Sequence, residues 1–201
     1  PEYLYYEVEL DTRKSGEKQF DYVDPRNREV QIEMEKACTA HLKAIGAYLE
    51  PKFRDVNLDE GDFKYEASVV IPCKNRVRTI ADAIRSALGQ KTDFPYNVIV
   101  VDDNSTDGTV DVIRSFDDPR LIYIAQDETY HAIGGNWNAA VNHPDCGRFA
   151  LQLDSDDLYS DENTVSRFVK AFREQNCAMV IGTYRITDFD LNTIPPGVID
   201  H

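Results

Sequence analysis

The stretch Leu151-Gln152-Leu153-Asp154-Ser155-Asp156-Asp157 decides the organisation of this chain. The apolar run 149–153 predicts a short buried strand, and that strand leads directly into three carboxylates within four residues. Two carboxylates about 5 Å apart repel each other by about 3 kcal/mol at an effective dielectric of about 20, so such a cluster favours a bound cation. The alternative interpretation is a solvated acidic turn that leads into the following helix.

The type of ligand in this cluster indicates which cation it would bind. Mg²⁺ and Mn²⁺ prefer oxygen ligands, and such ions commonly combine one or two protein carboxylates with the phosphate oxygens of a substrate. We therefore expect Mg²⁺ or Mn²⁺ and a phosphorylated ligand at the end of this strand. The net charge of −14, from 36 acidic and 22 basic residues, does not oppose a phosphorylated ligand, because a bound metal inverts the local charge.

Working outward from this stretch, the chain alternates apolar strands with amphipathic helices. Strands are expected at 68–71, 98–101, 121–125, 149–153 and 178–181, with Pro72 ending the first of them. Helices are expected between them, at 80–88, 110–116, 132–141 and 165–172. Strands that are apolar at every position are buried on both faces, and intervening helices supply that cover. The pattern predicts an α/β fold with a doubly wound, mostly parallel sheet and helices on both faces.

The strand order determines which loops meet. If the order is 3-2-1-4, the ends of the first and fourth strands flank the point where such sheets bind ligands. Residues 73–76 would then face residues 154–157, and Asp102 and Asp103 would lie beside them at the end of the second strand.

Residues 1–66 differ from the rest of the chain and are interpreted as an N-terminal extension of the domain at 67–201. A strand is expected at 3–10 and one long helix at 26–49, where Val30, Met34 and Ile45 recur at helical spacing. Residues 53–65 are acidic and are predicted to form a linker. We assign no chemistry to this extension.

Composition narrows the class of protein. The acidic balance argues against a nucleic-acid partner, which requires a basic face. No apolar run approaches the roughly 20 residues of a membrane span, so none is expected in this chain. The four cysteines show no CxxC pairing, and we expect free thiols in a reducing, cytoplasmic environment. The chain begins at Pro1, so we expect a piece of a longer protein, which could be peripheral to a membrane.

Three motifs resemble those of the family 2 glycosyltransferases, which have the GT-A fold. They are Ser68-Val69-Val70-Ile71-Pro72-Cys73-Lys74-Asn75, then Val100-Val101-Asp102-Asp103-Asn104-Ser105-Thr106-Asp107-Gly108-Thr109, and Leu153-Asp154-Ser155-Asp156-Asp157. The resemblance covers 68–184. It implies that the chain binds a nucleotide diphosphate sugar, with an Asp-x-Asp element holding Mn²⁺ or Mg²⁺ against the diphosphate.

The resemblance also implies a role for particular residues. Asp156 would be the main metal ligand, with Asp154 supporting the metal or the ribose. Asp103 would accept a hydrogen bond from the base, most often uracil. The nucleotide pocket would be lined by Pro72, Cys73, Lys74 and Asn75. Lys74 stands where the family often has an aromatic residue that stacks on the base.

The reaction implied is transfer of a sugar from a UDP-sugar to an acceptor hydroxyl, with inversion at the anomeric carbon. The acceptor could be a glycan, a lipid-linked sugar or a polysaccharide, and the general base is expected beyond this chain. Asp188 and Asp190 are interpreted as structural residues of a hairpin turn.

Two alternatives are carried with the transferase hypothesis. One is a nucleotide-sugar-binding fragment that is inactive by itself, because the acceptor half of the family is missing from the sequence. The other is a Mg²⁺-dependent phosphatase or phosphotransferase with Asp154 as nucleophile. That class generally places its aspartate pair after the first strand and needs a downstream lysine.

Overall fold

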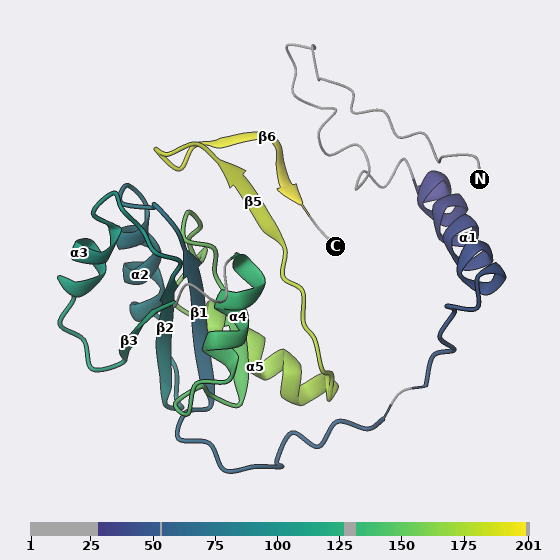
Figure 1. Cartoon of the computed structure of the whole chain (residues 1–201), viewed down its shortest axis with the longest axis horizontal. Helices are drawn as coiled ribbons and strands as arrows, with labels where there is room; N and C mark the ends of the chain where they lie inside the picture. Colours follow the sequence, from purple (N-terminus) through teal and green to yellow (C-terminus); the bar gives the residue numbers. More distant parts are fainter. Residues whose placement is uncertain (1–27, 53, 127–131, 200–201) are drawn as a thin grey trace. The chain divides into compact units, whose positions relative to one another are not determined.

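The computed structural model describes residues 28–52, 54–126 and 132–199. The chain divides into two compact units, one of residues 55–180 and the other of residues 1–54 with 181–201. The first unit contains, in order, β1 (Ala67–Cys73), α2 (Ile80–Leu88), β2 (Tyr96–Asp102), α3 (Thr109–Arg114), β3 (Leu121–Ala125), α4 (Ile133–Val141), β4 (Phe149–Gln152) and α5 (Thr164–Gln175) (Figure 1). The second contains α1 (Arg28–Ala44), β5 (Tyr184–Thr187) and β6 (Thr193–Ile199).

The first unit is built on a four-stranded sheet with the order β3-β2-β1-β4. Every neighbouring pair of strands in it is parallel. Cys73 lies beside Asp102 in the β1–β2 pair, and Val70 lies beside Gln152 in the β1–β4 pair. The predicted α/β sheet is therefore confirmed, and its strand order is the one on which the expected meeting of the loops depended. Because all four strands point the same way, the loops that follow β1, β2 and β4 leave the sheet at one edge.

Helices cover both faces of this sheet, as the uninterrupted apolar strands predicted. On one face, Val69, Ile71 and Val98 pack with buried residues of α2, α3 and α5. On the other face, Val70 and Ile99 pack with α4. All residues of β1 and β2 are buried, which accounts for the lack of alternation in their sequences.

β1 runs through Pro72, whereas the sequence predicted that the proline would end it. The carbonyl oxygen of Val70 accepts a hydrogen bond from the Leu153 amide at 3.1 Å, so the backbone of alternate residues in this part of β1 faces β4. β4 ends at Gln152, and Pro72 lies beyond the residue of β1 that pairs with it. A residue without an N–H group is tolerated there because the neighbouring strand has already stopped.

The strand expected at 178–181 was wrong, since residues 178–183 have no regular structure. Met179 and Ile181 are 73% and 65% exposed. The nearest strand, β5, pairs antiparallel with β6 and does not extend the parallel sheet. An apolar run forms a strand only where a neighbouring strand is available to bond it. The composition of the run does not reveal whether that partner exists.

The β5–β6 turn has the structural role that its sequence predicted. The Asp188 carboxylate accepts hydrogen bonds from the Asp190 and Asn192 amides at 3.0 and 2.9 Å, and from the Asn192 side chain at 3.1 Å. These bonds hold the pKa of Asp188 below its ordinary value.

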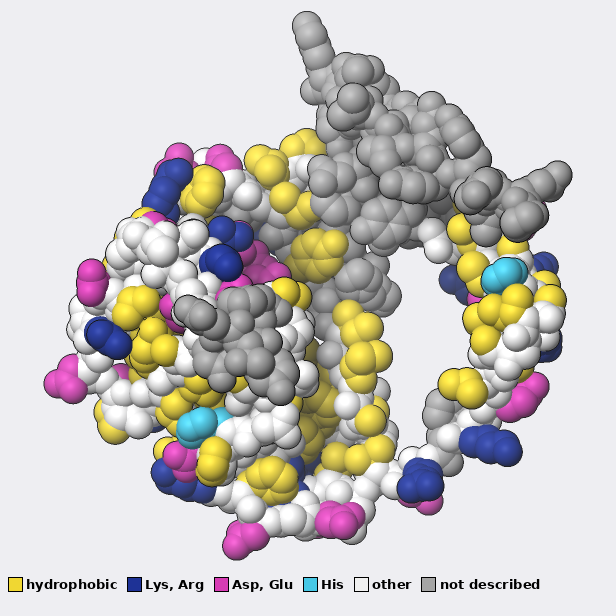
Figure 2. Space-filling view, in the orientation of Figure 1, with side chains coloured by type: hydrophobic (Ala, Val, Ile, Leu, Met, Phe, Trp, Pro, Cys, Tyr) yellow, Lys and Arg dark blue, Asp and Glu magenta, His cyan; other side chains and the backbone are white. Residues whose placement is uncertain are grey.

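The second unit also contains the predicted long helix, as α1. None of the residues of α1 is buried, and Val30, Met34 and Ile45 are each more than half exposed. The strand expected at 3–10 lies outside the described residues. No helix of the described ranges is both long and apolar enough to cross a membrane. Figure 2 shows acidic and basic side chains mixed over the viewed face of the molecule.

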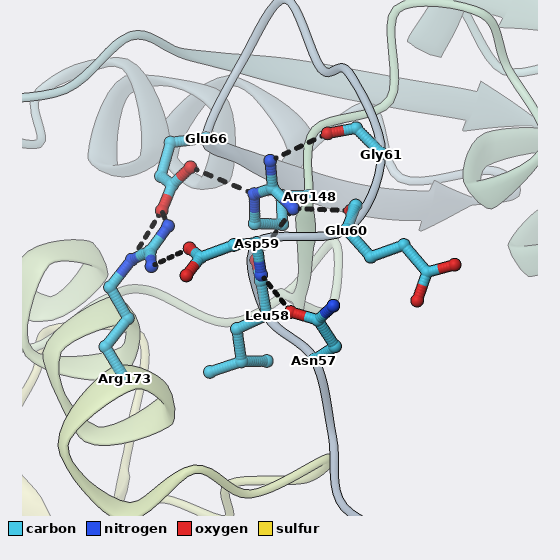
Figure 3. A network of polar contacts seen from close by, with 8 residues as sticks. All are labelled: Asn57, Leu58, Asp59, Glu60, Gly61, Glu66, Arg148 and Arg173. Atoms are coloured by element: carbon cyan, nitrogen blue, oxygen red, sulfur yellow. Dashed lines mark hydrogen bonds and ion pairs between the residues drawn. The ribbon is translucent and has the colours of Figure 1, made fainter.

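Residues 57–65, which lie in the predicted linker, and Glu66 are held against the rest of the first unit by two arginines (Figure 3). The Arg148 guanidinium donates to the carbonyl oxygens of Leu58 and Glu60, both at 2.7 Å, and to that of Gly61 at 3.1 Å. It also forms an ion pair with Glu66 at 3.4 Å. The segment is therefore fixed in place by side chains that lie distant in sequence.

Arg173 of α5 approaches Glu66 from the other side. It donates two hydrogen bonds to the Glu66 carboxylate and lies 3.2 Å from the Asp59 carboxylate (Figure 3). Glu66 directly precedes β1, and Arg148 directly precedes β4. We call the four residues Asp59, Glu66, Arg148 and Arg173 the amino-edge clamp.

Candidate functional site

The candidate site is formed by the loops that follow β1, β2 and β4. Their sharp turns depend on residues with left-handed backbone conformations: Asn75 with φ of 53°, Asn104 with φ of 56° and Gly108 with φ of 93°. Asparagine and glycine adopt this conformation at the lowest cost, which explains why they punctuate both of the first two loops.

The loops after β1 and β2 are bonded to each other. The Asn75 amide donates to the Ser105 hydroxyl at 2.8 Å, and the Thr106 amide donates to the Asn75 side chain at 2.9 Å. The Arg76 amide donates to the Thr109 hydroxyl at 2.8 Å. Asn75, predicted to line a nucleotide pocket, therefore joins two loops and sets the backbone of the residues around it.

Asp102 and Asp103 occupy different environments although they are adjacent. Asp102 is 2% exposed, and its carboxylate accepts hydrogen bonds from the amide and the hydroxyl of Ser105. The thiol of Cys73 lies 3.6 Å from the same carboxylate. Asp102 thus stabilises the loop after β2.

Asp103 is also buried, with its side chain 5% exposed. Its carboxylate forms an ion pair with Lys74 at 3.1 Å and accepts a hydrogen bond from the Ala132 amide at 3.4 Å. Lys74 is 55% exposed. Asp103, which was predicted to contact the base, and Lys74, which was predicted to line the nucleotide pocket, therefore lie together at the carboxyl edge of β1 and β2.

Pro72 and Cys73 are buried in β1 and present no free side chain to solvent. Burial, together with the negative charge of Asp102, raises the pKa of the Cys73 thiol far above its ordinary value. The thiol remains protonated at neutral pH and is unsuited to act as a nucleophile. Cys73 can contribute packing and backbone groups to a pocket.

The acidic cluster forms a tight turn after β4. The Asp157 amide donates to the Asp154 carbonyl oxygen at 3.0 Å, and Gln152 donates to the Asp154 carboxylate at 2.9 Å. Asp156 is 51% exposed on its side chain. Burial and the neighbouring charges of Asp154 and Asp156 raise the pKa of Asp157.

One ion pair connects this turn to the loop after β1. The Arg76 Nε atom lies 3.6 Å from the Asp156 carboxylate, and both side chains are about half exposed. Residues 73–76 and 154–157 therefore face each other, as the strand order predicted. The same edge carries Asp103 and Lys74.

The donor set suits a hard cation that takes most of its ligands from elsewhere. Within the described ranges, no three His, Cys, Asp or Glu side chains converge as a group that could hold a metal. Asp154 and Asp156 are separated by one residue in a turn and offer carboxylate oxygens at an accessible edge. This set fits Mg²⁺ or Mn²⁺, which commonly bind through one or two protein carboxylates and the phosphates of a substrate.

Gln152 is a site residue that sequence reasoning missed. It lies two positions before Asp154, so in an extended strand the two side chains project toward the same side. Its hydrogen bond holds one oxygen of the Asp154 carboxylate. A polar glutamine within an otherwise apolar run was the signal that could have revealed this contact.

Comparison with known proteins adds independent findings. Residues 68–198 match the family model described as Glycosyl transferase family 2. The UDP-Glc:alpha-D-GlcNAc-diphosphoundecaprenol beta-1,3-glucosyltransferase WfgD of Escherichia coli is 30% identical over 122 residues, which cover 61% of this chain and 47% of the relative. The putative teichuronic acid biosynthesis glycosyltransferase TuaG of Bacillus subtilis is 29% identical over 127 residues, which cover 62% and 49%.

Among solved structures, that of Staphylococcus aureus TarS 1–349 in complex with UDP is similar, with a TM-score of 0.46 and 26% identity. The match covers 54% of this chain and 31% of the other. The chain spans less than half the length of the two curated relatives named above.

Proposed function

The chain belongs to glycosyl transferase family 2, and on that premise we propose that it binds a UDP-sugar with a divalent cation for transfer of the sugar to an acceptor hydroxyl. The observation that carries this proposal is the meeting of two loops at one edge of the parallel sheet. Arg76, after β1, and Asp156, after β4, are joined there by an ion pair at 3.6 Å. Parallel α/β sheets bind ligands at such an edge, where the strand order reverses.

In this proposal Asp156 and Asp154 hold Mn²⁺ or Mg²⁺. The cation would offset the negative charge that gathers on the departing diphosphate. Asp156 supplies an accessible carboxylate oxygen, and Gln152 keeps the Asp154 carboxylate oriented. Burial first, and then the negative charges of Asp154 and Asp156, raise the pKa of Asp157, and a cation would offset the charge contribution.

The nucleoside would lie against the loops after β1 and β2. Asp103 would accept a hydrogen bond from the imide N–H of uracil, a donor that a carboxylate suits. Lys74 would exchange its ion pair with Asp103 for contact with the bound nucleotide. Backbone groups of residues 72–75 would line the pocket. A uridine nucleotide is supported by the name of the E. coli relative, which describes a UDP-Glc-dependent glucosyltransferase.

The acceptor is proposed to carry a free hydroxyl on a glycan, a lipid-linked sugar or a polysaccharide. The name of the same relative describes a sugar linked to diphosphoundecaprenol as its acceptor, which supports the lipid-linked class. Inversion at the anomeric carbon would require a carboxylate base to deprotonate that hydroxyl. We assign this base to no residue of the chain.

Two other functions follow less directly from the site. A donor-binding piece without turnover remains an alternative for this chain, and metal-dependent nucleotide binding without sugar transfer would identify it. A phosphatase that uses Asp154 as nucleophile is less favoured. Asp154 follows β4 instead of β1, and Lys170 forms an exposed ion pair with Glu174 on α5.

The test is calorimetric titration of the chain with UDP, GDP and dTDP, in Mn²⁺ and then in excess chelator. We expect UDP to bind most tightly and to lose most of its affinity with the chelator. Asp156→Ala should lower UDP affinity in Mn²⁺ by at least about tenfold, as loss of a charged ligand predicts. Asp111→Ala, which removes an exposed carboxylate of α3, is the matched control. Equal UDP affinity in both variants and the wild type would contradict the role given to Asp156.

A further inference from the structure

We propose that Arg76 competes with the divalent cation for Asp156, and that a nucleoside diphosphate ends the competition by taking the guanidinium onto its phosphate oxygens. The inference rests on the proposed function and adds to it a dependence of metal binding on nucleotide binding. The nucleotide would increase the affinity of the site for the metal, beyond the ligands that its phosphates supply.

The first step of the argument is the position of the guanidinium. Arg76 Nε lies 3.6 Å from Asp156 Oδ2, the carboxylate with the greatest exposure among the proposed metal ligands. A guanidinium and a divalent cation are both attracted to this carboxylate. Since each carries positive charge, they oppose each other at close range, and binding of one weakens the other.

The second step concerns which part of Arg76 can move. Its amide donates to the Thr109 hydroxyl at 2.8 Å, and its carbonyl oxygen accepts from the amides of Thr79 and Ile80 at 3.0 and 2.9 Å. The backbone is therefore fixed between the loop after β2 and the start of α2. The side chain is 45% exposed, so it can change partner without disturbing the loop that carries it.

The third step is the new partner. A guanidinium presents N–H groups in a planar fork that matches phosphate oxygens as well as carboxylate oxygens. A diphosphate carries more negative charge than a single carboxylate and therefore attracts the guanidinium more strongly. The proposed metal would hold the diphosphate against Asp156, which places phosphate oxygens within the neighbourhood of Arg76. Transfer of the guanidinium from Asp156 to phosphate would free the carboxylate for the metal.

The experiment measures Mn²⁺ binding directly, by electron paramagnetic resonance of the free ion, with and without UDP. It compares the whole wild-type chain with Arg76→Ala, Arg76→Lys and the control Arg85→Ala. Arg85 pairs with Asp82 at 2.7 Å on the exposed surface of α2, so the control removes the same charge and a similar ion pair.

Without UDP, Arg76→Ala should bind Mn²⁺ more tightly than the wild type, by up to about fivefold, the range of an exposed ion pair. With UDP, the advantage should vanish or reverse, because the variant also lacks the phosphate contact. Arg76→Lys, which keeps the charge, should lie nearer the wild type. Arg85→Ala should match the wild type under both conditions.

The outcomes separate this inference from the function on which it rests. If the wild type binds Mn²⁺ more tightly with UDP and Arg76→Ala behaves identically, the competition by Arg76 is overturned and the donor site stands. If Arg76→Ala binds Mn²⁺ more weakly than the wild type without UDP, the inference is likewise overturned. If no variant binds Mn²⁺ under either condition, the metal site itself is overturned, and the inference with it.

Discussion

At the scale of single residues, the two adjacent carboxylates after β2 have different partners. The Asp102 carboxylate accepts two hydrogen bonds from Ser105, and these bonds hold the loop in its conformation. Asp103 instead forms an ion pair with Lys74, whose exposed side chain can leave it. The contact of Asp103 with Lys74 can therefore be exchanged for a ligand without breaking the bonds between Asp102 and Ser105.

This difference predicts the effect of Asp103→Asn on base selection. The variant keeps the shape of the side chain but loses the charge that favours an imide donor. We expect UDP affinity in Mn²⁺ to fall by about tenfold or more, the range for a hydrogen bond to a charged group. Calorimetry with UDP and GDP measures the effect, with Asp111→Asn as the control. A loss of the same size for both nucleotides would indicate a structural role for Asp103 in place of base recognition.

The sequence predicted the individual carboxylates better than their partners. Asp103, Asp154 and Asp156 were singled out as candidates because each follows an apolar strand and because the family resemblance implied a role for each. The pairing of Lys74 with Asp103 spans 29 residues, and that of Arg76 with Asp156 spans 80. Such pairs depend on loop geometry set by several hydrogen bonds, which residue spacing along the chain does not encode.

At the scale of elements, the segment that leads into β4 passes so close to the start of β1 that only glycine fits at position 147. Gly147 is buried, and a Cβ atom built on it would lie 2.6 Å from the Ala67 carbonyl carbon. The Gly147 amide also donates to the Ser68 hydroxyl at 2.6 Å. The close contact is therefore between two backbones, which cannot yield as a flexible side chain would.

Gly147→Ala should accordingly lower the free energy of unfolding by about 1–3 kcal/mol, the usual effect of overpacking. Gly134→Ala is the matched control, because a Cβ atom there has no neighbour within 4 Å. On α4 this control should leave stability unchanged or raise it by up to about 1 kcal/mol. Urea denaturation of both variants measures the difference. Equal stability of the two would show that the backbone at Gly147 can move away.

The elements also show where sequence patterns succeed and where they stop. Uninterrupted apolar strands at 68–71 and 98–101 predicted a sheet covered on both faces, because burial alone produces that pattern. The pattern at 178–181 looked the same and was wrong, since these residues form no strand and none of the described strands pairs with them. Periodicity reports burial and amphipathicity, whereas the existence of a partner strand is a property of the whole fold.

At the scale of the whole molecule, the described apolar core lies within residues 67–172, and the amino-edge clamp adds residues 57–66 to it. The Arg148 side chain is 16% exposed and that of Glu66 is 19% exposed, so their ion pair is partly shielded from solvent. Breaking a shielded pair by removing one partner costs more than loss of an exposed one. The clamp should therefore contribute to the stability of the unit at 55–180.

Two truncations test this contribution. Removal of residues 1–54 leaves the unit at 55–180 complete and serves as the reference. Removal of residues 1–66 should lower the free energy of unfolding below that reference by about 2 kcal/mol, since Arg148 and Arg173 lose their partners. Urea denaturation measures both. Equal stability of the two truncated chains would mean that 55–66 is a linker after all.

The two ends of β1 have different roles, one in stability and the other in the candidate site. This separation affects which substitutions the protein can accept during evolution. Glu66 of the clamp precedes the strand, while Cys73 ends it and leads into Lys74 and Arg76 of the candidate site. The seven residues between span about 23 Å at the rise of a parallel strand. Substitutions that change donor preference can therefore accumulate at one end while folding is secured at the other. New specificities could evolve on this scaffold without a matching loss of stability.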